Sequence, residues 1–97
     1  MIDLFTNEPH IRLKIIREAL AISRKDFAKI LDISYRRYTR WEKVNTTLPV
    51  GTQQCMVKLG LNPFYVLGDP MLTINDIPFE NVKKAVIREL FNRSEQR

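Results

Sequence analysis

The stretch Ser23–Lys43, SRKDFAKILDISYRRYTRWEK, decides how the rest of the chain is expected to fold. Its first half predicts a short helix, because Ser23 can cap a helix and apolar residues recur at helical spacing between Phe27 and Leu31. The segment 32–34 breaks this pattern, and its last residue, Ser34, can cap another helix. The stretch therefore predicts two short helices joined by a tight turn.

The second of these helices, from about Tyr35 to Lys43, divides into an apolar and a basic face. Tyr38 and Trp41 are three residues apart and share one face, where a bulky aromatic pair is expected to pack in the core. The other faces carry the basic side chains Arg36, Arg37, Arg40 and Lys43. Residues 24–43 hold seven basic and three acidic side chains, whereas the whole chain has a net charge of only +5. Nearly all of the excess positive charge therefore lies in this stretch.

Two helices of this kind, the second of them basic, also predict a mechanism. In a helix-turn-helix, the first helix crosses the phosphate backbone of DNA and the second lies in the major groove. An arginine in that groove can donate two parallel hydrogen bonds to guanine O6 and N7. The stretch therefore predicts binding to double-stranded DNA.

Composition limits the class of protein. A chain of 97 residues with 44% hydrophobic residues and three glycines favours one small, mostly α-helical domain. Its net charge of +5 indicates an anionic partner, with nucleic acid ahead of a membrane surface. The single cysteine, Cys55, excludes an internal disulfide and a cysteine-based zinc cluster, and is expected to be a small core residue. Neither a metal nor another cofactor is expected.

Targeting signals and catalytic motifs are not evident. The N-terminal sequence MIDLFTNEPH is acidic and polar, and no apolar run approaches the roughly 20 residues of a membrane span. We therefore expect a soluble cytoplasmic protein, associated with the nucleoid of a bacterial cell. There is no glycine-rich phosphate loop and no nucleophile with a plausible histidine partner, so enzymatic activity is not expected.

Further helices are expected on both sides of the central stretch. One spans about 9–21, and the side chain of its Arg12 is expected to lie in solvent. Another spans 51–59. Gly60 is expected to end that helix, and Pro63 to begin a short helix that ends before 68.

Residues at several positions between 11 and 69 match the sequence pattern of a known protein family. They are Arg17, Ser23-Arg24, Ala28, Ile33-Ser34, Arg40-Trp41-Glu42, Pro49 and the closing LGLNPFYVLGD. At these positions about three fifths of the chain resembles the phage-repressor-like (Cro/Xre) helix-turn-helix family, which implies a five-helix DNA-binding domain. Asp32 replaces the turn glycine of the family, which is tolerable because Asp adopts left-handed conformations more readily than most residues. Val44 replaces the glycine that usually ends the recognition helix, so that helix is expected to run on or to end differently.

The resemblance assigns base contacts to three residues of the second helix: Tyr35, Arg36 and Arg40. Their chemistry agrees, because arginine pairs with guanine and a tyrosine ring can pack on a thymine methyl group. Phosphate contacts are expected from basic and hydroxyl side chains around this helix: Arg24, Arg37, Lys43, Thr46 and Thr47. The resemblance also implies a partly buried ion pair between Arg17 and Glu42 that sets the angle of the recognition helix.

The tail, residues 71–97, extends beyond this domain. Residues 71–74 are expected to form a short strand, and about 78–93 an amphipathic helix. A strand with no second strand in its own chain needs a partner. The tail therefore predicts a homodimer interface, made by Met71, Leu72, Ile74, Phe79, Val82, Val86, Leu90 and Phe91. In the alternative, 71–74 is merely extended and the helix folds back on the domain.

Together these features predict an all-α fold, with a five-helix helix-turn-helix domain over residues 1–70 and a strand-plus-helix dimerisation extension over 71–97. The expected function is that of a sequence-specific, double-stranded DNA-binding transcriptional regulator, a homodimeric repressor of phage or mobile-element origin. The alternative is an antitoxin that binds a toxin partner and its own operator, and a protein antirepressor is a further candidate partner. Binding to RNA or single strands is disfavoured, because the helical spacing sends most aromatic rings inward.

Overall fold

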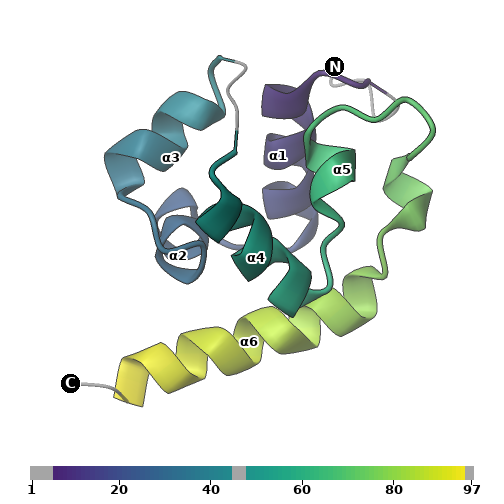
Figure 1. Cartoon of the computed structure of the whole chain (residues 1–97). Helices are drawn as coiled ribbons and strands as arrows, with labels where there is room; N and C mark the ends of the chain where they lie inside the picture. Colours follow the sequence, from purple (N-terminus) through teal and green to yellow (C-terminus); the bar gives the residue numbers. More distant parts are fainter. Residues whose placement is uncertain (1–5, 45–47, 96–97) are drawn as a thin grey trace.

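The structure, a computed structural model, describes residues 6–44 and 48–95 and contains only helices in these ranges (Figure 1). The α-helices are α1 (Pro9–Ala19), α2 (Arg24–Ile30), α3 (Tyr35–Trp41), α4 (Val50–Leu59), α5 (Pro63–Val66) and α6 (Phe79–Glu95). A single 3-10 turn, η1, spans Ile74–Asp76. The predicted all-α class is therefore confirmed for the described part of the chain.

Short polar side chains begin the two central helices. The Ser23 hydroxyl accepts a hydrogen bond from the Asp26 N–H at 3.0 Å, which satisfies one of the free donors in the first turn of α2. The Ser34 hydroxyl accepts one from the Arg37 N–H at 3.1 Å and does the same for α3. Both predicted caps are confirmed.

The turn between α2 and α3 is closed by backbone hydrogen bonds around Asp32. Asp32 adopts a left-handed conformation with φ of 61°, as expected for the residue in place of glycine. Its N–H donates to the Lys29 carbonyl at 3.2 Å, and the Ile33 N–H donates to the Ala28 carbonyl at 3.0 Å. The chain thus ends α2 and begins α3 within four residues, which sets the two helices against each other.

α3 ends in a different way from a helix that stops at a glycine. The helix stops at Trp41, and the next residue, Glu42, keeps a right-handed conformation. Val44 is not among the described residues with positive φ, so no left-handed cap is needed where the glycine is missing. Residues 45–47 lie outside the described ranges.

The helices enclose a single hydrophobic core. α1 lies beside α5, α2 packs on α3, and α6 crosses beneath α2 and α4 (Figure 1). Side chains with no exposed surface come from all parts of the chain: Ile16, Phe27, Tyr38, Met56 and Val82. Cys55 is partly buried against this core. Because Val82 belongs to the tail, residues on both sides of the predicted boundary at 70/71 share one core.

The strand predicted for residues 71–74 does not form. The Thr73 N–H donates to the Asp76 carboxylate at 2.7 Å, and the Thr73 hydroxyl accepts from the Asn75 N–H at 3.3 Å. These bonds form a capping box that turns the chain into η1. With no second strand in the described ranges, an isolated strand would leave its backbone groups without partners.

The apolar stripe of α6 is largely buried within the chain, which matches the alternative in which this helix folds back on the domain. Val82 and Val86 are fully buried where α6 packs on α2 and α4. Other predicted interface residues are partly buried against the core: Leu72, Ile74, Phe79 and Leu90. Met71 and Phe91 remain exposed. An apolar stripe at helical spacing predicts that one face of the helix is buried, but it does not show whether the same chain or a second copy buries that face.

Arg12 is the largest departure from the sequence prediction, because its side chain is buried and not in solvent. Its guanidinium donates to the backbone carbonyls of Thr6 at 2.7 Å, Tyr65 at 2.6 Å, Asp69 at 2.9 Å and Leu72 at 2.8 Å. It also lies over the Tyr65 ring, 4.3 Å from the centroid. One buried cation therefore joins α1 to the end of α5 and to the segment before η1.

Candidate nucleic-acid interface

The apolar face of α3 holds the helix against the body of the protein. The Tyr38 ring is fully buried and meets Phe27 edge to face, with centroids 5.4 Å apart and planes at 65°. Trp41, nearly one turn further on, is also buried. Both predicted core positions are confirmed, and they determine which residues of α3 face outward.

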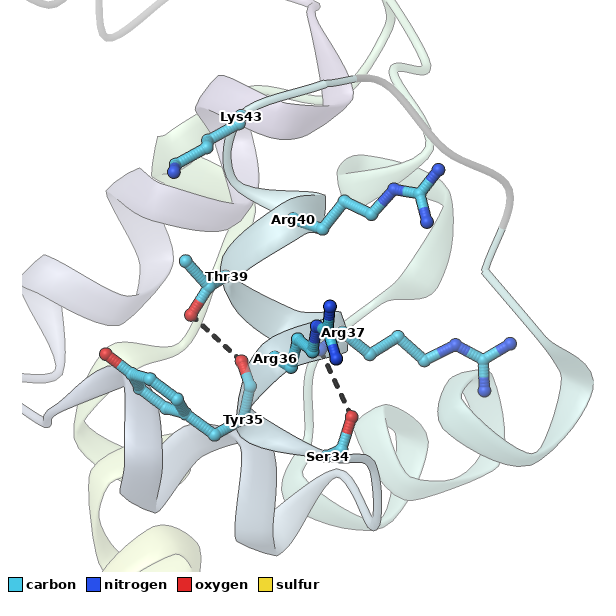
Figure 2. A pocket seen from close by; sticks show the side chains of 7 residues that line it. All are labelled: Ser34, Tyr35, Arg36, Arg37, Thr39, Arg40 and Lys43. Carbon is cyan, nitrogen blue, oxygen red and sulfur yellow. Dashed lines mark hydrogen bonds between the residues drawn. The ribbon is translucent and has the colours of Figure 1, made fainter.

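The outward face of α3 carries the residues that were predicted to contact bases and phosphates. Its exposed side chains are Tyr35, Arg36, Arg37 and Arg40, and Lys43 is exposed two residues beyond the end of the helix. Figure 2 shows Tyr35 and Lys43 on one side of the helix and Arg40 extending from the other. Together with Ser34 and Thr39, these side chains line an open hollow along α3. The structure therefore brings the three predicted base-contacting residues together on one surface.

Thr39 belongs to this surface and was not predicted. Its hydroxyl donates to the Tyr35 carbonyl at 2.9 Å, so the hydroxyl oxygen, as an acceptor, and the methyl group remain to contact another molecule. The sequence contained a signal for it, because Tyr35, Thr39 and Lys43 are each four residues apart and therefore share one side of a helix. Thr46 and Thr47, which were predicted to contact phosphates, lie outside the described residues.

The basic side chains on and just after α3 have no acidic partners among the residues that the structure describes. None of the ion pairs among the described residues includes Arg36, Arg37, Arg40 or Lys43. Arg37 is held in part by its own helix, since its guanidinium carbon lies 6.0 Å from the centroid of the Trp41 ring. Four uncompensated positive charges on one surface create a potential that attracts a polyanion.

The ion pair predicted between Arg17 and Glu42 is confirmed, with Nε and Oε2 2.6 Å apart. Arg24 joins it, because its Nε lies 3.0 Å from Oε1 of the same carboxylate. Sequence reasoning treated Arg24 only as a phosphate ligand and missed this contact. The cluster links α1, the start of α2 and the end of α3, so it contributes to the angle at which α3 is held.

The environment of this cluster shifts three pKa values. Burial alone would raise the pKa of Glu42, but its interactions with Arg17, Tyr38 and Arg24 outweigh burial and lower it. Burial tends to lower the pKa of Arg17, and the hydrogen bond to Glu42 reverses this and raises it. Burial raises the pKa of the Tyr38 phenol, and the nearby Glu42 carboxylate adds to the shift. Near neutral pH, Arg17 and Glu42 are therefore charged and Tyr38 is neutral.

Acid is expected to destabilise the protein through Glu42. Because the folded state lowers its pKa, Glu42 contributes stability that is complete above its ordinary pKa of 4.5 and is lost as pH falls through the folded value. Glu42→Gln removes this dependence, so the unfolding free energies of wild type and variant should converge between about pH 6 and pH 3. Thermal unfolding across this pH range measures the difference. A constant gap at every pH would contradict the assignment.

The described residues lack the features of two other kinds of site. They contain no group of three or more His, Cys, Asp or Glu side chains that could hold a metal ion. None of their helices has the length and apolar character needed to span a membrane. Comparisons of the chain with protein-family models, with curated proteins and with solved structures found no match.

Proposed function

We propose that this chain is a sequence-specific, double-stranded DNA-binding transcriptional regulator of the phage-repressor-like (Cro/Xre) helix-turn-helix type. The observation that carries the proposal is the exposed basic face of α3, which has no acidic partner in the described residues. This face is backed by Tyr38 and Trp41, so it is held rigidly to the core. α2, the turn through Asp32 and α3 supply the pair of helices that such a protein uses.

In this proposal α3 is the recognition helix. An α-helix with its side chains is about 10–12 Å across, which suits the width of the major groove of B-DNA, about 12 Å. Arg36 and Arg40 lie one turn apart and reach base edges, where each can bind a guanine through two hydrogen bonds. Tyr35 contacts a neighbouring base, for example through a thymine methyl group. Arg37 and Lys43 neutralise phosphates on either side.

The proposal includes a homodimeric repressor, because two copies related by a two-fold axis read two half-sites and occupation of an operator blocks a promoter. Met71 and Phe91 are the predicted interface residues that are still exposed to a second copy. Sedimentation is expected to give twice the chain mass of 11.5 kDa. A stable one-to-one complex with a different protein would instead support the antitoxin alternative.

Loss of base discrimination is the expected result of changing Arg36 or Arg40. Duplexes enriched from a random library by the wild-type protein supply the cognate site. Arg36→Ala and Arg40→Ala should each lose about 1–3 kcal/mol of binding to it and relax the preference at particular base pairs. Arg88→Ala is the matched control, because Arg88 is an exposed arginine of α6, a helix that lies apart from α3 (Figure 1). Titrations with matched and mismatched duplexes measure the effect.

Two outcomes would overturn the proposal. The first is that the wild-type protein enriches no sequence from the library. The second is that Arg88→Ala weakens binding as much as Arg36→Ala, which would place the DNA contact on a different surface. Circular dichroism of each variant checks that it remains folded.

A further inference from the structure

The carboxylate of Glu42 lies between two arginines that use it differently. Arg17 donates from Nε to Oε2 at 2.6 Å and from Nη2 to Oε1 at 3.4 Å, and its Nη1 donates to the Ile22 carbonyl at 3.2 Å. All three nitrogens of Arg17 are therefore engaged, and its side chain is 12% exposed. Arg24 donates from Nε alone, to Oε1 at 3.0 Å, and its side chain is 43% exposed.

The terminal nitrogens of Arg24 are left for another partner. Nη1 and Nη2 of this residue have no hydrogen-bond acceptor within the described residues. Two guanidinium groups share one carboxylate, so the cluster keeps one positive charge, on its exposed side. The Nε bond restricts a side chain that would otherwise sample many rotamers. A guanidinium held in this way presents two parallel N–H donors, which match two oxygens of a phosphate.

The position of the cluster fits the backbone of a duplex in contact with α3. Glu42 is the C-cap of α3 and Arg24 is the first residue of α2, so their contact brings the start of one helix to the end of the other. Lys43 follows Glu42 directly and is exposed. Two cations therefore lie at the same end of the basic face, where a phosphate strand that borders the groove would pass.

We propose that Glu42 is a positioning residue for DNA binding, which holds Arg24 by Nε so that Nη1 and Nη2 bind a backbone phosphate beside α3. This inference rests on the proposed function. Glu42 then increases affinity for a polyanion without touching it, although it is itself an anion. Arg17 allows a carboxylate to lie close to a phosphate, because its positive charge compensates that of Glu42 and limits the repulsion between the two anions.

A double-mutant cycle between Glu42 and Arg24 tests the inference. The enriched duplex is titrated at salt concentrations from about 50 to 200 mM, where phosphate contacts dominate the change in affinity. Arg24→Ala should reduce the slope of log K against log salt by about 0.9, the value for one phosphate contact. Glu42→Gln should weaken binding and reduce the slope in the same direction. In the Arg24→Ala background it should add no further loss, because the two residues act as a unit.

A purely structural role for Glu42 predicts a different result. If Glu42 only sets the angle of α3 through Arg17, Glu42→Gln would weaken binding equally with and without Arg24 and would alter base preference, and this outcome overturns the inference. An unchanged salt slope in Glu42→Gln also overturns it. Lys25→Ala is the control for losing a neighbouring exposed cation of α2, and it should show no coupling to Glu42→Gln.

A second variant covers the case in which Glu42→Gln does not fold. Arg24→Lys leaves the Arg17–Glu42 pair and the total charge intact but removes the Nε contact and the parallel donors. It should bind the duplex more weakly than wild type, and equal affinity would overturn the inference. Failure of the wild-type protein to bind any duplex would overturn the proposed function as well. If Arg36→Ala alters base discrimination but the double-mutant cycle shows no coupling between Glu42 and Arg24, the proposed role of Glu42 is overturned and the proposed function is not.

Discussion

Replacing Arg12 by methionine is expected to unfold the protein or to lower its stability by several kcal/mol. The substitution keeps a long side chain but removes every donor to the carbonyls of Thr6, Tyr65, Asp69 and Leu72. A buried polar group that loses its partner costs about 1–3 kcal/mol, whereas a domain of this size has a total stability of about 5–15 kcal/mol. Chemical denaturation followed by circular dichroism measures the loss.

Two further variants define what the Arg12 result means. Arg12→Lys keeps the positive charge but offers a single ammonium group, which cannot reach four carbonyls, so its stability should fall between those of wild type and Arg12→Met. Lys29→Met, at an exposed position of α2, makes a similar change of side chain where no buried carbonyl depends on it, and should be nearly neutral. Wild-type stability in Arg12→Met would show that the guanidinium does not support the fold.

Trp41→Ala should have the next largest effect, because Trp41 anchors α3. Truncating a buried aromatic side chain typically costs about 3–5 kcal/mol. Trp41 is only 4% exposed and lies in the core cluster, so a loss in that range is expected. Arg36→Ala, on the outward face of the same helix, should change stability by no more than about 0.5 kcal/mol. Thermal unfolding of both variants separates anchoring from recognition.

The two variants of α3 should also differ in how they lose DNA binding. Trp41→Ala should weaken binding to all duplexes alike, because a loosened helix presents every contact poorly. Arg36→Ala should weaken binding mainly to the cognate duplex, since it removes one proposed base contact from an intact surface. If Trp41→Ala proved as stable as wild type, the assignment of the buried and exposed faces of α3 would be wrong.

The sequence by itself determined the helices and the two faces of α3. Ser23 and Ser34 cap their helices through hydrogen bonds to residues only three positions away, so short-range sequence was sufficient to place both starts. The spacing of Tyr38 and Trp41 likewise identified the buried face, and with it the outward surface that carries Arg36 and Arg40. These features depend on local hydrogen bonds and helical periodicity, which the order of residues encodes directly.

Only the tertiary structure decided the contacts of Arg12 and Arg24 and the packing of the tail. The Arg12 guanidinium binds the Tyr65 carbonyl, 53 residues away, and a backbone acceptor at that distance leaves no pattern in the sequence. Arg24 meets Glu42 because the turn through Asp32 folds α3 back on α2. The stripe of α6 likewise indicated that this face is buried but not what buries it, because removing apolar surface from water is favourable whether the same chain or a second copy covers it.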